Sequence, residues 1–186
     1  MRKLIYSFGV SLDGFIADPG GGIDWSVPGE ELHRFHNQQA RELGAELYGR
    51  RLWEVMRVWE TWEDDRPSAP EAELEFARIW KETPKIVFSR TLERVEGNAT
   101  LVREDAAEEV ARLKGQPGKD LAVGGAALAS SLMKAGLIDE YRLFVNPVVL
   151  GGGTPFFPAL DERINLELVE TRDFGSRVVY LRYRTA

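Results

Sequence analysis

The sequence lacks cysteine altogether and contains only two histidines, His33 and His36. Without thiols the chain can form no disulfide, no thiolate metal site and no cysteine nucleophile, and nothing argues for an oxidising compartment. With only two histidines, we do not expect a zinc site. The composition therefore predicts a protein that works without a disulfide and without a bound metal.

Long apolar runs and basic tracts are also missing. No stretch approaches the length of a membrane-spanning helix, and the opening residues, MRKLIYSFGV, become polar too quickly for a signal peptide. Thirty acidic side chains against 24 basic ones give a net charge of −6, which argues against nucleic acid as a partner. We expect a cytoplasmic protein that binds any anionic ligand through a local group of residues.

The 186 residues fit one domain, 1–186, able to bury about 70% of its unfolded surface. Strand-like segments alternate with helical periodicity, and the chain ends in an expected antiparallel pair around Phe174-Gly175-Ser176. This order predicts an α/β fold with a mixed sheet and helices on both faces. The predicted strands are 3–10, 45–48, 85–89, 99–103, 121–123, 140–150, 166–171 and 178–184, the predicted helices are 30–44, 53–56, 72–80, 106–113 and 126–135, and 59–70 is expected to be irregular.

The most informative segment is 121–157, LAVGGAALASSLMKAGLIDEYRLFVNPVVLGGGTPFF, which joins a strand, a glycine turn, a helix and a second strand. Gly124 and Gly125, after Val123, allow a sharp turn and the close approach of a ligand to the backbone. A helix that opens at Ala126 would direct free N–H groups and its positive dipole end at an anion. These residues predict a phosphate-binding turn, although two glycines could equally form only a strand-to-helix corner.

Two further turns follow the same logic. Gly49-Arg50-Arg51 lies between a predicted strand and a predicted helix, where the guanidinium groups could pair with phosphate or could simply be solvated. Ser89-Arg90-Thr91 follows the strand KIVFS at its carboxyl end, where ligands gather in open α/β sheets. Hydroxyls beside an arginine suit a ribose 2′-phosphate, but an ordinary polar loop would use the same residues.

A glycine-rich loop, DPGGG at 18–22, precedes Trp25. A mobile loop with an aromatic anchor suits a lid over a binding site. The alternative is an exposed connection whose tryptophan fills the core. Both interpretations remain open from the sequence.

Five segments occur in a characteristic order, namely SLDGFIA, ELYGRRLWE, KIVFSRTL, LAVGGAALASSLMKAGLIDEYRL and PVVLGGGTPFF. In these segments, which span nearly the whole chain, the sequence resembles the dihydrofolate reductase superfamily, and within it the stand-alone relatives of the riboflavin-biosynthesis reductase (RibD C-terminal) domain. The resemblance implies a dihydrofolate reductase-like three-layer fold with a mostly parallel sheet and a C-terminal antiparallel hairpin. It also implies NADPH as cofactor, hydride transfer to a pterin-like or pyrimidine-like heterocycle, and a homodimer.

The resemblance also assigns roles by position. It implies that the pyrophosphate lies against the turn at 123–126, that 49–51 form the second phosphate turn, and that the 2′-phosphate lies at 89–91. The implied cofactor-binding residues are Gly9, Ile16, Ala17, Gly49, Arg50, Arg51, Ser89, Arg90, Thr91, Val123, Gly124, Gly125 and Ala126, and the implied substrate-binding residues are Trp25 and Phe35.

The proton donor is expected to be one of three carboxyl groups or an ordered water. In folate reductases an acidic side chain on the helix after the lid binds the pteridine. This position is Glu30 when counted from Trp25, but Glu31 when counted from Phe35. An acidic pair is also an ordinary feature of a helix N-terminus. Asp13 is the third candidate, although an Asp-Gly pair is a strong turn former.

The sequence departs from the family pattern in two ways. Ala126 and Ala127 replace the third glycine and the basic residue that can bind the 2′-phosphate, so Arg90 or Arg51 must supply that charge or the preference for NADPH is relaxed. The zinc-binding set of the deaminase half is missing as well.

We therefore predict an NADPH-dependent reductase, most like the 5-amino-6-(5-phosphoribosylamino)uracil reductase step of riboflavin biosynthesis. One alternative is dihydrofolate reductase activity. The other is a non-catalytic nucleotide-binding module that self-associates through the strand at 140–150 and the glycines at 151–153.

Overall fold

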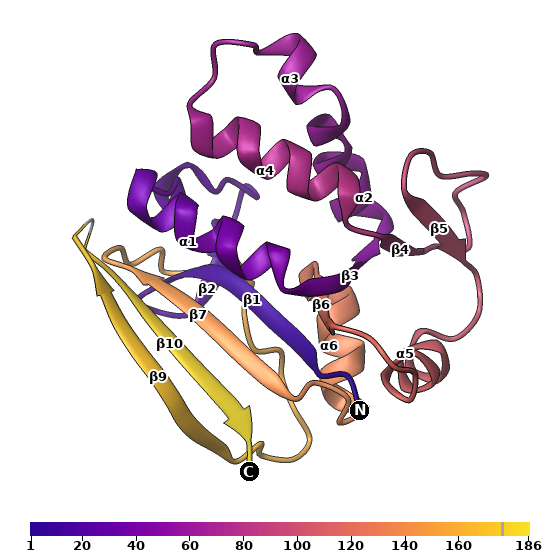
Figure 1. Ribbon diagram of the computed structural model, residues 1–186. Helices are drawn as coiled ribbons and strands as arrows, with labels where there is room; N and C mark the ends of the chain where they lie inside the picture. The colour runs from indigo at the N-terminus through magenta and orange to yellow at the C-terminus, as the bar shows by residue number, and fades with distance from the viewer. Residues whose placement is uncertain (176) are drawn as a thin grey trace.

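The computed structural model describes residues 1–175 and 177–186, so Ser176 of the predicted hairpin lies outside the described residues. An eight-stranded sheet forms its centre, in the order β5-β4-β3-β6-β1-β7-β10-β9 (Figure 1). The strands of this sheet are β1 (Leu4–Ser11), β3 (Leu43–Gly49), β4 (Lys85–Phe88), β5 (Ala99–Val102), β6 (Asp120–Gly124), β7 (Glu140–Asn146), β9 (Leu166–Phe174) and β10 (Val178–Thr185).

The first six strands in this spatial order are parallel to one another, and β10 is antiparallel to both β7 and β9. The predicted mixed, mostly parallel sheet with a C-terminal antiparallel pair is therefore confirmed. Helices cover both faces, and they are α1 (Glu30–Arg41), α2 (Arg50–Met56), α3 (Trp62–Asp65), α4 (Glu71–Glu82), α5 (Ala106–Lys114) and α6 (Ala126–Lys134), with short 3-10 turns η1 (Asp24–Ser26) and η2 (Arg57–Glu60). None of the described helices is long and apolar enough to cross a membrane.

The main core lies between the sheet and the pair α5 and α6. Side chains of a strand alternate between its two faces, so Tyr6 of β1 and Val123 of β6 project to the same side. There they pack with Val110 of α5 and Leu132 of α6. All four side chains are almost completely buried. This layer fixes the turn between β6 and α6, because both of its flanking elements are anchored in one core.

The opposite face of the sheet is covered by α1, α2 and α4, as Figure 1 shows. Leu32 of α1 packs with aromatic residues of β7, β9 and β10. Trp53 of α2 and Trp80 of α4 stack at 6.0 Å in a third cluster over β3 and β4. The side chains of β1 and β6 that project to this face are mostly small, which becomes important for the site described below.

A second, two-stranded sheet pairs β2 (Phe15–Ala17) with β8 (Thr154–Pro155). Gly153, next to β8, has a φ of +130°, and a Cβ atom there would lie 2.0 Å from the carbonyl oxygen of Ala17. Only glycine permits both this backbone conformation and this approach. The loop after β7 is thereby held against the loop after β1.

Several predicted boundaries are wrong. The predicted helix 30–44 ends at Arg41, because Leu43 already pairs with Asp120 of β6 and starts β3. The segment 59–70 is not wholly irregular, since it contains α3 and part of η2. In both places the tertiary contacts override a helical stripe or a proline-rich composition.

The strand predicted at 140–150 ends at Asn146, and both of its edges are occupied by β1 and β10. An interior strand offers no free backbone groups to a second chain. The strand therefore offers no free edge for the predicted self-association, which, with the glycines at 151–153, stays a prediction.

We expect Gly153→Ala to destabilise the protein by about 2–4 kcal/mol, because it combines an unfavourable φ with a backbone clash. Gly152→Ala is the matched control, since a Cβ atom there would make only an ordinary contact at 3.7 Å with Pro19. Denaturant unfolding of both variants measures the difference. Equal free energies of unfolding would contradict the close contact between Gly153 and Ala17.

Candidate active site

The three predicted nucleotide turns lie next to one another at the carboxyl edge of the parallel strands. Gly49 of β3 is paired with Phe88 of β4, which Ser89 follows. On the other side of β3, Tyr48 is paired with Gly124 of β6. Because the strands are parallel, the turns that follow them emerge at the same edge. Three segments that are up to 75 positions apart in the sequence, counted from Gly49 to Gly124, therefore meet there.

Arg50 connects two of these turns. Its Nη1 atom donates to the Thr91 hydroxyl at 2.9 Å, and its Nε atom donates to Glu54 at 2.8 Å. The Ser89 hydroxyl accepts hydrogen bonds from the backbone N–H groups of Thr91 and Leu92, which makes it a turn former. The predicted neighbours Arg50 and Thr91 are thus brought into direct contact.

Arg51 and Arg90 are both exposed, and neither forms an ion pair with any described residue. The carbonyl oxygen of Arg90 accepts a hydrogen bond from Arg103, which fixes the loop without using the Arg90 side chain. The two guanidinium groups are therefore the free positive charges of these turns. Either one could approach an anion.

Glycine is required at positions 124 and 125 for different structural reasons. A Cβ atom on Gly124 would lie 2.4 Å from Cδ2 of Leu52, so glycine is needed there for α2 to pack closely on β6. Gly125 has a φ of +93° and precedes Ala126, the first residue of α6. The Val123 side chain is buried in the main core, so only its backbone faces the turn. Packing accounts for Gly124, whereas Gly125 sets the direction of the turn.

The other end of the same edge is formed by Gly9 and its neighbours. A Cβ atom on Gly9 would lie 3.4 Å from Cβ of Ser26 and 3.6 Å from Nδ2 of Asn146. The buried Asn146 amide donates to the carbonyl oxygen of Phe144 at 2.9 Å, which holds the end of β7 in place. Ile16, which packs against the main core, and Ala17 lie on β2 beside this group. Asn146 was missed by the sequence analysis, although it stands at a strand end directly before Pro147.

Small side chains form the floor between these two ends. Ser7 and Gly9 of β1, with Ala122 and Gly124 of β6, project to the face covered by α1 and α2, and all four keep partly exposed surfaces. Ser7 is paired with Arg142 and Gly9 with Phe144 of β7. Larger side chains therefore flank these rows of small residues, which we call the floor, and Leu52 and Ser26 pack over Gly124 and Gly9.

His36 of α1 forms part of the wall on the β7 side. Its ring lies 4.2 Å from the Phe144 ring, and it makes no hydrogen bond with the described residues. Burial and, to a lesser extent, the neighbouring His33 lower the pKa of His36 to about 4. The imidazole is therefore neutral near pH 7. The sequence analysis assigned this histidine no role.

The two predicted acids of α1 point outward. The Glu30 side chain is 73% exposed and pairs with Arg34 at 2.6 Å, and the Glu31 side chain is 62% exposed and pairs with Arg172 at 3.3 Å. Exposed pairs of this kind contribute little to stability. In this structure both carboxyl groups are paired with exposed arginines.

Asp13 fastens a loop. Its two carboxylate oxygens accept hydrogen bonds from the backbone N–H groups of Leu150 at 3.1 Å and Gly151 at 2.7 Å. The Ser11 hydroxyl and these N–H groups lower the pKa of Asp13 to about 2. An ionised carboxylate accepts hydrogen bonds and has no proton to donate at neutral pH. The geometry therefore favours the turn-forming role over the acid role.

The predicted lid is an ordered turn in this structure. The Asp18 carboxylate accepts the N–H groups of Gly20 and Gly22, each at 2.8 Å. Trp25 lies in η1, and its Nε1 atom donates to the carbonyl oxygen of Gly22 at 3.2 Å. Trp25 thus ties the loop to η1 and is only half-buried.

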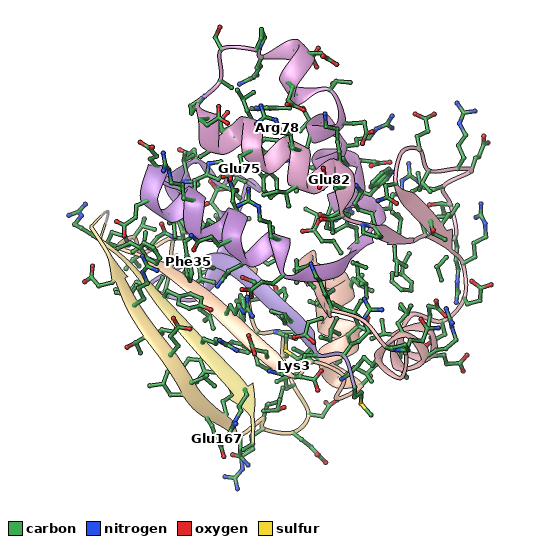
Figure 2. All side chains as sticks on the ribbon, in the orientation of Figure 1. Lys3, Phe35, Glu75, Arg78, Glu82 and Glu167 are labelled. Carbon is green, nitrogen blue, oxygen red and sulfur yellow. The ribbon has the colours of Figure 1, made fainter. Side chains whose placement is uncertain are left out.

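Phe35 packs among aromatic residues. Its ring lies 5.2 Å from Phe174 and 5.1 Å from Tyr180, with the Arg172 guanidinium 4.9 Å above it. Figure 2 shows Phe35 between α1 and the strands of the C-terminal hairpin. These contacts describe a core-packing residue, and the predicted contact with substrate stays a prediction.

A separate hollow of about 380 Å³ lies between α2, η2 and Glu96. Its lining includes the carboxyl groups of Glu54, Glu60 and Glu96 against one arginine, Arg57. An excess of acidic groups disfavours a phosphate ligand. The turns at the sheet edge, and not this hollow, therefore provide the better anion site.

Comparison with known proteins agrees with this geometry. The family model described as the RibD C-terminal domain matches residues 2–180. The chain belongs to the RibD C-terminal domain family. It is 37% identical over 185 residues to the uncharacterized protein YyaP of Bacillus subtilis (strain 168), covering 98% of this chain and 94% of that protein. It is 31% identical to the uncharacterized protein YwjB of the same organism, over 95% of each chain.

Solved structures share the fold. A protein assigned to riboflavin biosynthesis from Shewanella sp. PV-4 has a TM-score of 0.77 at 24% identity, covering 100% of this chain and 99% of that one. The deaminase/5-amino-6-(5-phosphoribosylamino)uracil reductase of Thermotoga maritima has a TM-score of 0.67 at 17% identity, covering all of this chain and 57% of that one. Dihydrofolate reductase of Enterococcus faecalis, complexed with NADP(H) and RAB-propyl, has a TM-score of 0.61 at 16% identity, covering 98% and 96%. The predicted dihydrofolate reductase-like fold is confirmed, and the comparisons support an oxidoreductase in the general sense.

We expect His36→Phe to reduce the acid sensitivity of folding. Because the pKa of His36 is lowered to about 4 in the folded state, the unfolded chain binds a proton first as the pH falls below about 6.5, so stability is lost on acidification. Free energies of unfolding at pH 7 and pH 5 should differ by about 1–2 kcal/mol less in the variant than in the unchanged protein. An identical pH dependence in the two proteins would contradict the burial of a neutral imidazole.

Proposed function

We propose that this protein is an NADPH-dependent reductase that transfers a hydride to a pyrimidine-like or pterin-like heterocycle. The observation that supports this proposal is the convergence of three turns at one sheet edge, with Arg50 hydrogen-bonded to Thr91 between two of them. The heterocycle would most resemble the 5-amino-6-(5-phosphoribosylamino)uracil named for the Thermotoga maritima relative. A role in riboflavin biosynthesis is part of this proposal.

The residues present suit an extended dinucleotide. The turn at Gly125 and the start of α6 would take the pyrophosphate, while Arg51 or Arg90 would supply the positive charge that Ala127 does not. The other end of the cofactor would lie near Gly9, where a side chain would meet Ser26 and Asn146. These placements follow from the positions of the turns along one edge.

In such a reaction the bound cofactor would supply the hydride, and the protein would supply alignment and a dry, shaped surface. The small side chain of Ser7 would leave room over the sheet for a flat ring, and the neutral His36 with Phe144 would form a wall beside it. The ionised Asp13 holds the loop at 150–151 against the edge. These residues would position a substrate, and hydride transfer would need no nucleophile from the protein.

The outward orientation of Glu30 and Glu31 favours the second candidate, a nucleotide-binding module without turnover. Self-association is part of that candidate and of our expected homodimer. The exposed apolar residues Leu168 and Val169 on the edge strand β9 offer a surface for it in place of β7. Turnover separates the two functions. Reduction of 5-amino-6-(5-phosphoribosylamino)uracil supports the enzyme, reduction of dihydrofolate instead supports the folate alternative, and binding without either supports the module.

We expect NADPH to quench tryptophan fluorescence and to raise the melting temperature. Arg50→Met should weaken NADPH binding about tenfold, roughly 1.4 kcal/mol, because it separates the turns at Gly49 and Thr91. Arg163→Met, at an exposed arginine in the loop after β8, is the control and should leave the affinity unchanged. Absence of both quenching and thermal shift at millimolar NADPH would rule out the proposed function.

The cofactor preference should depend on the two free arginines. If Arg90 or Arg51 binds the 2′-phosphate, replacing it by methionine should weaken NADPH about tenfold and leave NADH unchanged, because NADH lacks that phosphate. Fluorescence titration of the two single variants with both cofactors measures this. A preference that survives both substitutions would show that neither arginine makes the contact.

A further inference from the structure

Glu46 is a carboxyl group on the floor-facing side of the central sheet to which no role has been assigned. It lies on β3, where it is paired with Ala122 of β6 on one side and with Lys85 of β4 on the other. Ala122 is in turn paired with Ile5 of β1. Since Glu46 and Tyr48 share one face of β3, Glu46 stands beside the low floor of small residues, one row below Tyr48 and Gly124.

The contacts of Glu46 leave one oxygen free. The Tyr48 hydroxyl donates to Oε2 of Glu46, and Nε1 of Trp80 donates to the Tyr48 oxygen at 3.2 Å. The other oxygen, Oε1, accepts no hydrogen bond from the described residues. Glu46 also keeps a partly exposed surface, although both edges of its strand are paired. Oε1 is therefore the oxygen left for a contact with a bound ligand.

The surroundings of Glu46 favour a protonated carboxyl group. Burial raises the pKa of Glu46, and the Tyr48 hydroxyl and the charge of Lys85 offset part of the rise. Burial also lowers the pKa of Lys85, whose Nζ lies 3.9 Å over the Trp80 ring and donates to the Trp80 carbonyl oxygen instead of to Glu46.

The other elements around Glu46 bring few charges. Neighbouring β6 presents Ala122, α4 presents Trp80, and Glu60 of η2 acts on Lys85. Glu46 thus differs from the three acids expected from the sequence. Glu30 and Glu31 are solvated and paired with arginines, and Asp13 is ionised. A general acid has to be protonated and within reach of the substrate.

We propose that Glu46 is the catalytic residue that donates the proton in the reductase reaction, with Tyr48 as its positioning residue. This inference rests on the proposed function. With NADPH bound, the carbon of a substrate C=N bond would receive the hydride that the cofactor supplies, and the π-electron pair would move to nitrogen. The nitrogen takes the proton from Oε1 of Glu46. NADPH is oxidised to NADP⁺, the substrate is reduced, and the Glu46 carboxylate regains its proton from water.

The first experiment compares Glu46→Gln with the unchanged protein, using 5-amino-6-(5-phosphoribosylamino)uracil and NADPH. We expect kcat to fall about 100-fold while the Kd for NADPH is unchanged. In the unchanged protein kcat should fall as the pH rises through the raised pKa of Glu46, and this limb should disappear in the variant. The matched control is Glu82→Gln at an exposed carboxyl group on α4, labelled in Figure 2, which should change neither value.

The second variant is Tyr48→Phe, which keeps the ring and removes the hydroxyl. Because that hydroxyl lowers the pKa of Glu46, its loss should move the limb of the kcat profile to higher pH. A purely structural role for Tyr48 would lower kcat at all pH values without moving the limb. An unmoved limb in Tyr48→Phe, or full activity with an unchanged profile in Glu46→Gln, overturns the assignment and leaves the reductase function standing.

A measurement without substrate separates the two proposals. Carbon-13 NMR of protein labelled at the glutamate carboxyl carbons, with Glu46→Gln for assignment, should show one carboxyl group that titrates above the ordinary range. Titration of Glu46 in the ordinary range overturns the assignment whatever the activity. Absence of NADPH binding, in contrast, overturns the reductase function and is detected independently of the carboxyl signal.

Discussion

The candidate site depends on the parallel pairing of β4, β3, β6 and β1. Parallel strands place all their carboxyl ends at one edge, so the turns after β3, β4 and β6 become neighbours although they are far apart in the sequence. The same pairing fixes the rows of side chains across the sheet. Small residues on β1 and β6 therefore lie in adjacent rows, while larger residues on β3 and β7 flank them.

Local patterns were sufficient to predict the turns but not the side-chain directions. Gly49, Ser89 and Gly125 are recognisable because a turn after a strand needs particular residues, and the register of parallel strands then brings them together. The direction of Glu30 depends on the rotation of α1 about its axis, which is set by Leu32 and its aromatic partners on other strands. A stripe of apolar residues shows which face of a helix is buried but not which exposed side chains face a ligand, so the sequence alone left Glu30 and Glu31 as open alternatives.

Glu46 shows that the sequence can also miss a candidate acid. In the sequence it is one acidic residue in a short strand, and strand propensity alone gives it no role. Its distinct environment comes from two residues. Sheet pairing places Lys85 of β4 beside it, and Tyr48, two positions along the same strand, donates its hydroxyl to the carboxyl group. Glycines show a related ambiguity, since Gly124 is required for the packing of Leu52 whether or not a ligand binds. A predicted binding turn can therefore lie at the expected place although one of its glycines is required for packing and not for ligand binding.

The fastening of the loop at 150–151 by Asp13 has a consequence for experiments on this protein. With a pKa of about 2, Asp13 keeps its charge over the range in which such proteins are assayed, so the shape of the edge beside Gly9 does not change with acidity. The loop at 150–151 therefore stays hydrogen-bonded to Asp13 across this range. Changes in rate or stability between pH 4 and pH 9 can then be traced to groups that titrate within that range rather than to the release of this loop.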